Sequence, residues 1–131
     1  GQGLVAGRGR NAALYIGLGN GTMAKIAVRD GRILWRYDYG RGQSQGQPAL
    51  AGCCLVFGAW NGRLYCLDAS TGALRWTWSN GSKSLFLAPG NIVPRIARGR
   101  VFIDAPDRAV TCLDLASGRV VWRCRDYKAR E

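Results

Sequence analysis

Short apolar runs separated by polar turn residues recur along all 131 residues and predict a protein built of β-strands. The stretches ALYIG, CLVFGAW and RVFIDA are rich in β-branched, aromatic and leucine residues, which favour strands. Each is followed by a turn and a second apolar run: AKIAV, RLYCLDA and AVTCLDL. The first two turns are Asn-Gly, the strongest short-range signal for a hairpin. No segment shows sustained helical periodicity, so we expect an all-β fold.

The same sequence motif recurs along the chain, which indicates internal repeats. Three tryptophans align at spacings of 41 and 46 residues, and each follows a glycine by four positions. The pairs are Gly31 and Trp35, Gly72 and Trp76, and Gly118 and Trp122. Four short strands repeating at this period are typical of propeller blades. We therefore expect one propeller segment over residues 1–131, with blades at 3–38, 48–79 and 93–125 and a basic C-terminal tail at 126–131.

Asp68 and Asp114 begin turns of the form Asp-x-x-Ser/Thr-Gly, where the first copy has Ala27 instead. In such turns the aspartate accepts hydrogen bonds from nearby backbone N–H groups, and the glycine adopts positive φ. The turn leads into an alternating strand. Alternation predicts that Leu74, Trp76 and Trp78 share one face of that strand.

The motif Leu-Asp-x-x-Ser/Thr-Gly-x-x-x-Trp resembles the tryptophan-docking repeat of the pyrroloquinoline-quinone-type (quinoprotein-like) β-propellers. The resemblance covers nearly the whole chain. It implies that Trp35, Trp76 and Trp122 pack between blades, each near the turn glycine of the next blade. Because propellers close with about 4–8 blades, we expect three blades to form a partial ring. We expect the missing blades to come from the rest of a larger protein, from a second copy or from other protein subunits.

Adjacent Cys53 and Cys54 resemble the vicinal pair over the cofactor in quinoprotein alcohol dehydrogenases, which makes them the weak candidates for cofactor binding. Their context differs, because Cys53 aligns with a turn glycine and the family's Asp-x-x-Asn-Arg-Gly segment is missing. We therefore predict free thiols and no cofactor. Pyrroloquinoline quinone with calcium belongs only to the alternative that the chain is a fragment of a quinone-dependent dehydrogenase.

The chain contains five cysteines and no histidine, which argues against a mixed zinc site and excludes a Ser-His-Asp triad. No other catalytic constellation emerges, so we expect no enzymatic site in this segment. Small buried thiols favour a reducing compartment, whereas the family resemblance also allows the periplasm. No apolar run is long enough to form a transmembrane helix.

The net charge is +11, and the basic residues are mostly arginine. Such a surface attracts polyanions, so a basic module that binds nucleic acid or another polyanion is a second alternative. Our main expectation is a non-catalytic propeller segment that acts as a protein-interaction scaffold or ligand-binding platform. Its interaction face is expected to include exposed loop and turn residues. The candidates are Trp60, Arg63, Tyr39, Arg41, Lys83, Phe86 and Arg108.

Overall fold

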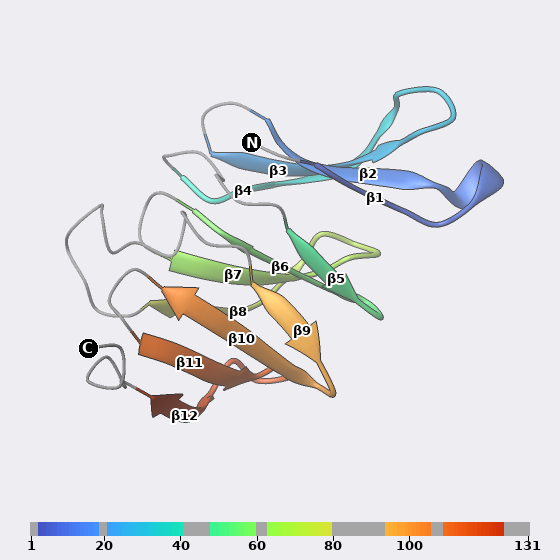
Figure 1. Cartoon of the computed structure of the whole chain (residues 1–131). Coiled ribbons are helices and arrows are strands. Elements are labelled where there is room, and N and C mark those ends of the chain that lie inside the picture. The colour runs from blue at the N-terminus through green and yellow to red at the C-terminus, as the bar shows by residue number, and fades with distance from the viewer. Residues whose placement is uncertain are drawn as a thin grey trace.

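The computed structural model describes residues 3–18, 21–40, 48–59, 63–79, 94–105 and 109–124. These residues form three four-stranded antiparallel sheets (Figure 1). Sheet 1 contains β1 (Leu4–Ala6), β2 (Ala13–Leu18), β3 (Thr22–Ala27) and β4 (Ile33–Asp38). Sheet 2 contains β5 (Ala49–Ala51), β6 (Cys54–Gly58), β7 (Arg63–Asp68) and β8 (Leu74–Ser79). Sheet 3 contains β9 (Arg95–Ala97), β10 (Arg100–Ala105), β11 (Ala109–Asp114) and β12 (Val120–Cys124).

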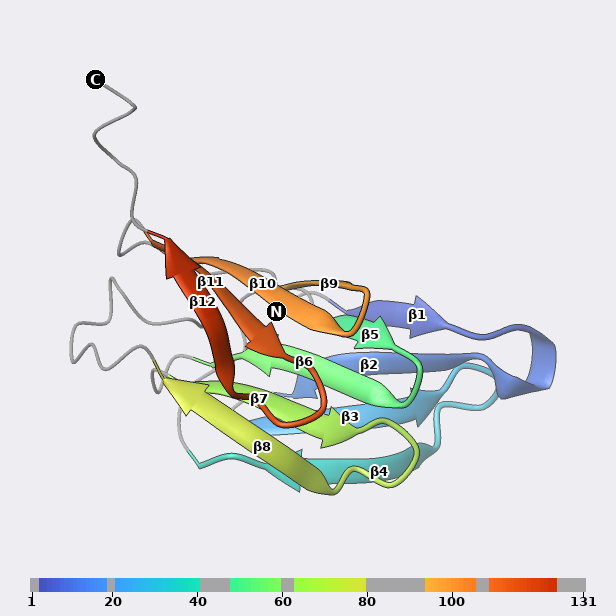
Figure 2. The same cartoon turned by 90° about the horizontal axis from the view of Figure 1, so that it is seen from below.

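The prediction of an all-β fold with three four-stranded units is confirmed. In the described part of the chain, the one helical element is a short 3-10 turn, η1 (Gly9–Asn11), between β1 and β2. No helix among these residues is long and apolar enough to cross a membrane. Each sheet is a meander of neighbouring strands, and sheet 2 lies between the other two (Figures 1 and 2).

In every sheet the pairing between the third and fourth strands contains one β-bulge, at the same repeat position. In sheet 2 the register shifts so that Trp76 pairs with Cys66, whereas Leu74 pairs with Leu67. Cys66 and Leu67 are neighbours on one strand and point to opposite faces. The prediction that Leu74 shares a face with Trp76 is therefore wrong. Leu74 is exposed, because the bulge interrupts strict alternation.

Two apolar cores hold the three sheets together. Between sheets 1 and 2, aromatic and aliphatic side chains from both sheets are almost fully buried, among them Tyr15, Met23, Leu55, Phe57 and Leu67. Between sheets 2 and 3, a second core contains Val56, Leu64, Cys66, Val101 and Ile103. Sheet 2 thus buries both faces, which explains why β6 is buried along its whole length.

A tryptophan at the edge of each core connects one sheet to a turn of the next. The Trp35 indole Nε1–H donates to the carbonyl oxygen of Ala69 at 2.8 Å, and its ring lies against Gly72. The Trp76 indole makes the same contacts in sheet 3, donating to the Leu115 carbonyl at 2.7 Å and lying against Gly118. The two interfaces therefore repeat one arrangement.

Only glycine fits beneath these rings. A Cβ on Gly118 would lie 2.5 Å from the Trp76 ring, and a Cβ on Gly72 would lie 2.6 Å from the Trp35 ring. Both glycines also have positive φ, +76° and +80°. The sequence thus needs glycine here for two reasons, backbone conformation and close approach.

The end sheets present the unmatched halves of this contact. Trp122 occupies the same strand position as Trp76 but is 43% exposed, compared with 7% for Trp76. Among the described residues, its ring contacts Phe102 of its own sheet, with the two ring centroids 6.1 Å apart. At the opposite end, Gly31 has φ of +77°, and a Cβ there would meet no described atom within 4 Å.

We predict that Trp76→Ala lowers the free energy of unfolding by roughly 3–5 kcal/mol, as for other buried aromatic side chains. The loss combines apolar burial with the hydrogen bond to the Leu115 carbonyl. Urea denaturation followed by circular dichroism measures it. The matched control is Trp122→Ala at low protein concentration, which should cost roughly 1 kcal/mol because this ring is already half-exposed. Equal losses in both variants would contradict the assigned contact.

A second prediction compares two turn glycines of nearly identical φ. Alanine at Gly31 or Gly118 introduces similar backbone strain. Gly118→Ala also displaces the Trp76 ring, so it should be less stable than Gly31→Ala by a further 1–3 kcal/mol, roughly the cost of overpacking. Thermal unfolding of the two variants provides the comparison. Equal melting temperatures would show that a Cβ at position 118 does not disturb the Trp76 ring, and this would contradict the close contact between that ring and Gly118.

Candidate functional site

The predicted interaction residues fall into three groups. Arg63 is exposed at the start of β7. Tyr39 is described but is not a surface residue. The others lie outside the described residues: Trp60, Arg41, Lys83, Phe86 and Arg108. The structure therefore places one member of the predicted set, Arg63, on the described surface.

The prediction that Tyr39 lies in an exposed connecting loop is wrong, because its side chain is buried. It is 7% exposed and packs in the core between sheets 1 and 2. Its ring centroid lies 5.4 Å from that of Phe57 and 5.5 Å from that of Tyr65. The backbone N–H of Tyr39 continues the sheet by donating to the Gly21 carbonyl. Its aromatic ring thus closes one end of the core.

The aspartates of the repeated turns organise the surfaces that receive the tryptophans. The Asp68 carboxylate accepts hydrogen bonds from the backbone N–H groups of Ser70 at 2.8 Å and Thr71 at 3.3 Å. Asp114 accepts from the Ser117 backbone at 3.1 Å and from its hydroxyl at 2.7 Å. These bonds fix the turns whose glycines lie under the indole rings.

The adjacent cysteines point into different environments. Cys54 is buried in the core between sheets 2 and 3, within hydrogen-bonding reach of Cys66. Cys53 is exposed, and Arg75 Nη1 donates to its Sγ at 3.6 Å. Burial raises the pKa of the Cys66 thiol to about 12, with a smaller contribution from Cys54. All five cysteines are free thiols in the structure.

This arrangement does not fit the quinone site that the family resemblance implies. A cofactor platform needs both sulfurs of the vicinal pair on an accessible surface, and Cys54 instead faces the apolar core. Calcium needs several oxygen ligands. Across the described ranges, no three His, Cys, Asp or Glu side chains cluster to hold a metal ion.

The structure also shows a charged hollow that the sequence analysis did not identify. It measures about 420 Å³ and lies at one end of sheet 1, between η1 and the turn that joins β3 to β4. Four cationic side chains line it: Arg10, Lys25, Arg29 and Arg32. Its other lining residues are Asn11, Ala12, Ala27, Asp30 and Leu34. We call it the blade-1 hollow.

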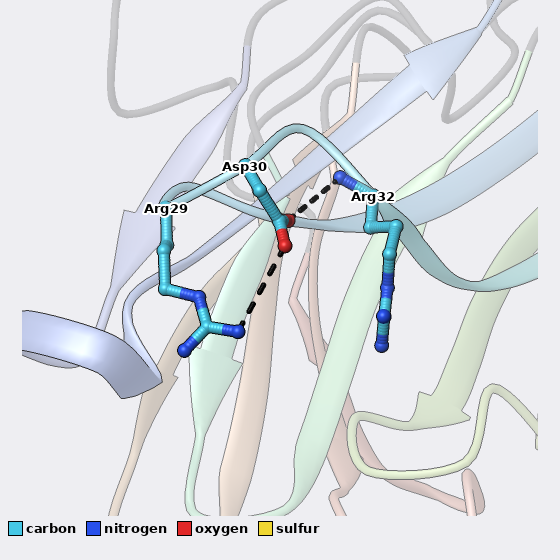
Figure 3. Close-up of polar contacts among 3 residues, drawn as sticks. All are labelled: Arg29, Asp30 and Arg32. Atoms are coloured by element: carbon cyan, nitrogen blue, oxygen red, sulfur yellow. Dashed lines mark hydrogen bonds and ion pairs between the residues drawn. The ribbon is translucent and has the colours of Figure 1, made fainter.

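Asp30 lies between the two turn arginines of this hollow (Figure 3). Its Oδ2 is 3.9 Å from Arg29 Nη2, and its Oδ1 accepts a hydrogen bond from the Arg32 backbone N–H at 3.1 Å. The Arg29 and Arg32 side chains extend to the same side of the turn (Figure 3). Because four cations meet one carboxylate, the hollow is electropositive.

Two sequence signals could have revealed the hollow. The connection between the first two strands is longer in sheet 1, where it includes η1, than in sheets 2 and 3. In addition, the turn Arg29-Asp30-Gly31-Arg32 replaces the uncharged Ser70-Thr71-Gly72-Ala73 of sheet 2. Both differences from the other sheets add arginine side chains to the lining of the blade-1 hollow.

The burial of the thiols leads to a third prediction. In the native protein a charged aromatic disulfide reagent at mildly alkaline pH should modify two cysteines, the exposed Cys53 and Cys124. Cys54, Cys66 and Cys112 should react only after unfolding, because the reagent reacts with accessible thiolate. Counting released chromophore before and after denaturation tests this, and the denatured, unreduced protein should give five. A denatured count of three, with the loss mapped to Cys53 and Cys54, would revive the vicinal disulfide.

Comparison with known proteins places this geometry in context. A quinone-type alcohol dehydrogenase, dehydrogenase subunit, from Komagataeibacter europaeus is 32% identical over 127 residues, covering 77% of this chain and 16% of that protein. The outer membrane protein assembly factor BamB of Shewanella oneidensis is 28% identical over 125 residues, covering 95% of this chain and 30% of that protein. The chain therefore spans less than a third of the length of either relative.

The fold itself matches a solved structure. The crystal structure of BamB from Moraxella catarrhalis superimposes with a TM-score of 0.72 at 21% identity, covering 86% of this chain and 33% of that one. At this identity the likeness shows the fold, which is that of a β-propeller segment. The family profile described as outer membrane protein assembly factor BamB matches residues 19–130. Because that match covers most of the sequence, the chain belongs to this family of pyrroloquinoline-quinone-type propeller repeats.

Proposed function

We propose that this chain is a non-catalytic propeller segment that acts as a protein-interaction scaffold and joins other blades of the same repeat through its end faces. The observation that carries this proposal is the contrast between its tryptophans. Trp76 packs against a turn of the neighbouring sheet and is 7% exposed. The equivalent Trp122 is 43% exposed. Gly31, at the other end, has open space where Gly72 and Gly118 each receive a ring.

The exposed apolar side chains of the end faces favour binding of a partner. Besides Trp122, Val110 is exposed on the same face of sheet 3, and Val120 and Val121 are also exposed on β12. Burying one large apolar side chain contributes roughly 1.5–3 kcal/mol. Several such side chains together are comparable with the net stability of a small domain, which is about 5–15 kcal/mol. A second blade surface that covers them is therefore strongly favoured.

The chain itself contains both kinds of surface that a docking contact between blades requires. A donor face supplies an indole N–H, and a receiving face supplies a turn glycine and a carbonyl three residues before it. Sheet 3 offers the donor through Trp122, and sheet 1 offers the turn through Val28 and Gly31. In a preparation of this chain alone, a second copy provides both the indole donor face and the receiving turn.

The scaffold role is supported by the relatives named as outer membrane protein assembly factors. Propeller rings present their connecting loops on two flat faces, so one segment can contribute several contact loops to a partner. The partner of the assembled ring is, in this proposal, another protein subunit.

A fragment of a quinone-dependent dehydrogenase is the second candidate function, because a quinone-type dehydrogenase subunit is 32% identical to the chain. Under this alternative, cofactor and calcium ligands would come from other blades. Adding pyrroloquinoline quinone and calcium to the protein and recording the absorbance of the bound quinone distinguishes the two. Stoichiometric binding would favour the dehydrogenase, whereas the scaffold proposal expects none.

The fourth prediction tests the end faces. Light scattering on this chain across a concentration series should show association beyond the monomer. Trp122→Ala should weaken that association about tenfold or more, since it removes a large buried aromatic ring from the contact. Trp78→Ala provides a matched loss of an aromatic residue from an internal sheet, packed against the core between sheets 2 and 3. It should leave the association constant nearly unchanged if the variant remains folded. A compact, cooperative monomer at every concentration would contradict the proposal.

A further inference from the structure

We propose that the blade-1 hollow is a binding site for an acidic peptide segment of a partner protein. This inference rests on the proposed scaffold function and names the chemistry of one partner. Arg10, Lys25, Arg29 and Arg32 surround the hollow, and one carboxylate, that of Asp30, lies among them. The excess positive charge selects a ligand that brings further carboxylates.

The cations come from separate parts of sheet 1 and converge on one place. Arg10 lies on η1, Lys25 on β3, and Arg29 and Arg32 on the turn before β4. The η1 turn and the β3–β4 turn lie at the same end of the sheet (Figures 1 and 2). A guanidinium binds a carboxylate through two parallel hydrogen bonds, which gives such a site directional specificity.

Asp30 shows that the site can accept a carboxylate. Its carboxylate oxygen lies 3.9 Å from Arg29 Nη2 while another oxygen accepts the Arg32 backbone N–H (Figure 3). The Arg29 side chain is 55% exposed, so its guanidinium remains accessible for a second partner. A ligand carboxylate would therefore join or replace an interaction that the hollow already makes.

The apolar part of the hollow favours a peptide over a phosphate backbone. Ala12, Ala27 and Leu34 line it, and Leu34 is 47% exposed. Exposed Val28 and Ile33 lie next to these residues in the sequence. A volume of about 420 Å³ accommodates one or two side chains. An acidic segment with an apolar side chain can thus fill the hollow and pair its carboxylates with the rim.

Sheets 2 and 3 provide an internal comparison. The position of Lys25, opposite the docking tryptophan, is taken by Cys66 in sheet 2 and Cys112 in sheet 3. Sheet 3 keeps an arginine after its turn glycine, Arg119, but has Ala116 where sheet 1 has Arg29. The cation cluster is therefore a local feature of sheet 1 and does not follow from the repeat.

The test uses the full chain and a short fluorescein-labelled peptide of alternating glutamate and leucine, followed by fluorescence anisotropy. The double variant Arg29→Gln with Arg32→Gln should bind this peptide roughly tenfold more weakly, because two charge-assisted contacts are lost. Arg119→Gln makes the same chemical change at the same turn position of sheet 3. It should alter the affinity by less than about twofold, as expected for a screened, distant charge.

Two further measurements sharpen the assignment. Asp30→Asn keeps an acceptor for the Arg32 N–H and removes the competing charge, so it should tighten peptide binding by about threefold. A peptide with glutamine in place of glutamate should bind at least roughly tenfold more weakly, because its side chains carry no charge.

Several outcomes would overturn the inference. Equal loss of affinity in the Arg119→Gln variant would mean diffuse attraction to a basic surface. Displacement of the peptide by inorganic phosphate alone, or tighter binding of duplex DNA at the same arginines, would assign the site to phosphate chemistry. Light scattering on the double variant tests the scaffold proposal separately, because Arg29 and Arg32 flank Gly31 in the turn that the proposal assigns to a tryptophan of another blade. Loss of peptide binding with unchanged association supports the site independently of the ring.

Discussion

One interaction sets the arrangement of the whole structure: an indole ring that lies on the turn glycine of the next sheet and donates its N–H to a carbonyl three residues earlier. It occurs as Trp35 on Gly72 and as Trp76 on Gly118. The hydrogen bond is directional, and the bare glycine lets the ring approach closely. Together they fix the distance and rotation between sheets, while the apolar cores supply most of the burial energy.

This constraint explains both what repeats and what differs along the chain. The aspartates that bond the turns, the positive-φ glycines and the tryptophans recur because each sheet must fit its neighbour. Other positions are free to vary, and there the chain carries its individual features. The cations of the blade-1 hollow come from an inserted 3-10 turn and from turn residues that the repeat does not specify. In our proposal the partner site thus uses residues that the repeat leaves free to vary, and two of them, Arg29 and Arg32, flank the turn glycine Gly31.

The sequence contained enough information for the strands and their grouping, because turn residues and apolar runs mark each hairpin locally. It could not place Leu74, since a bulge changes the face of a residue without leaving a clear mark in the pattern. Tyr39 was assigned to a loop, although its ring packs on Phe57 from the next sheet, a contact that depends on tertiary arrangement. The hollow was missed for a similar reason, because Arg10 and Arg29 meet only after sheet 1 has folded.

The central claim is that sheets 1 and 3 carry the two separate halves of a contact that is made twice between the described sheets. Hydrogen exchange of the indole N–H groups, measured by NMR on protein labelled with ¹⁵N-tryptophan and assigned by single substitutions, tests this most directly. The account predicts slow exchange for Trp35 and Trp76 in the monomer and fast exchange for Trp122, which becomes protected as the chain associates. Fast exchange of Trp76 in the folded monomer, or no added protection of Trp122 on association, would contradict it.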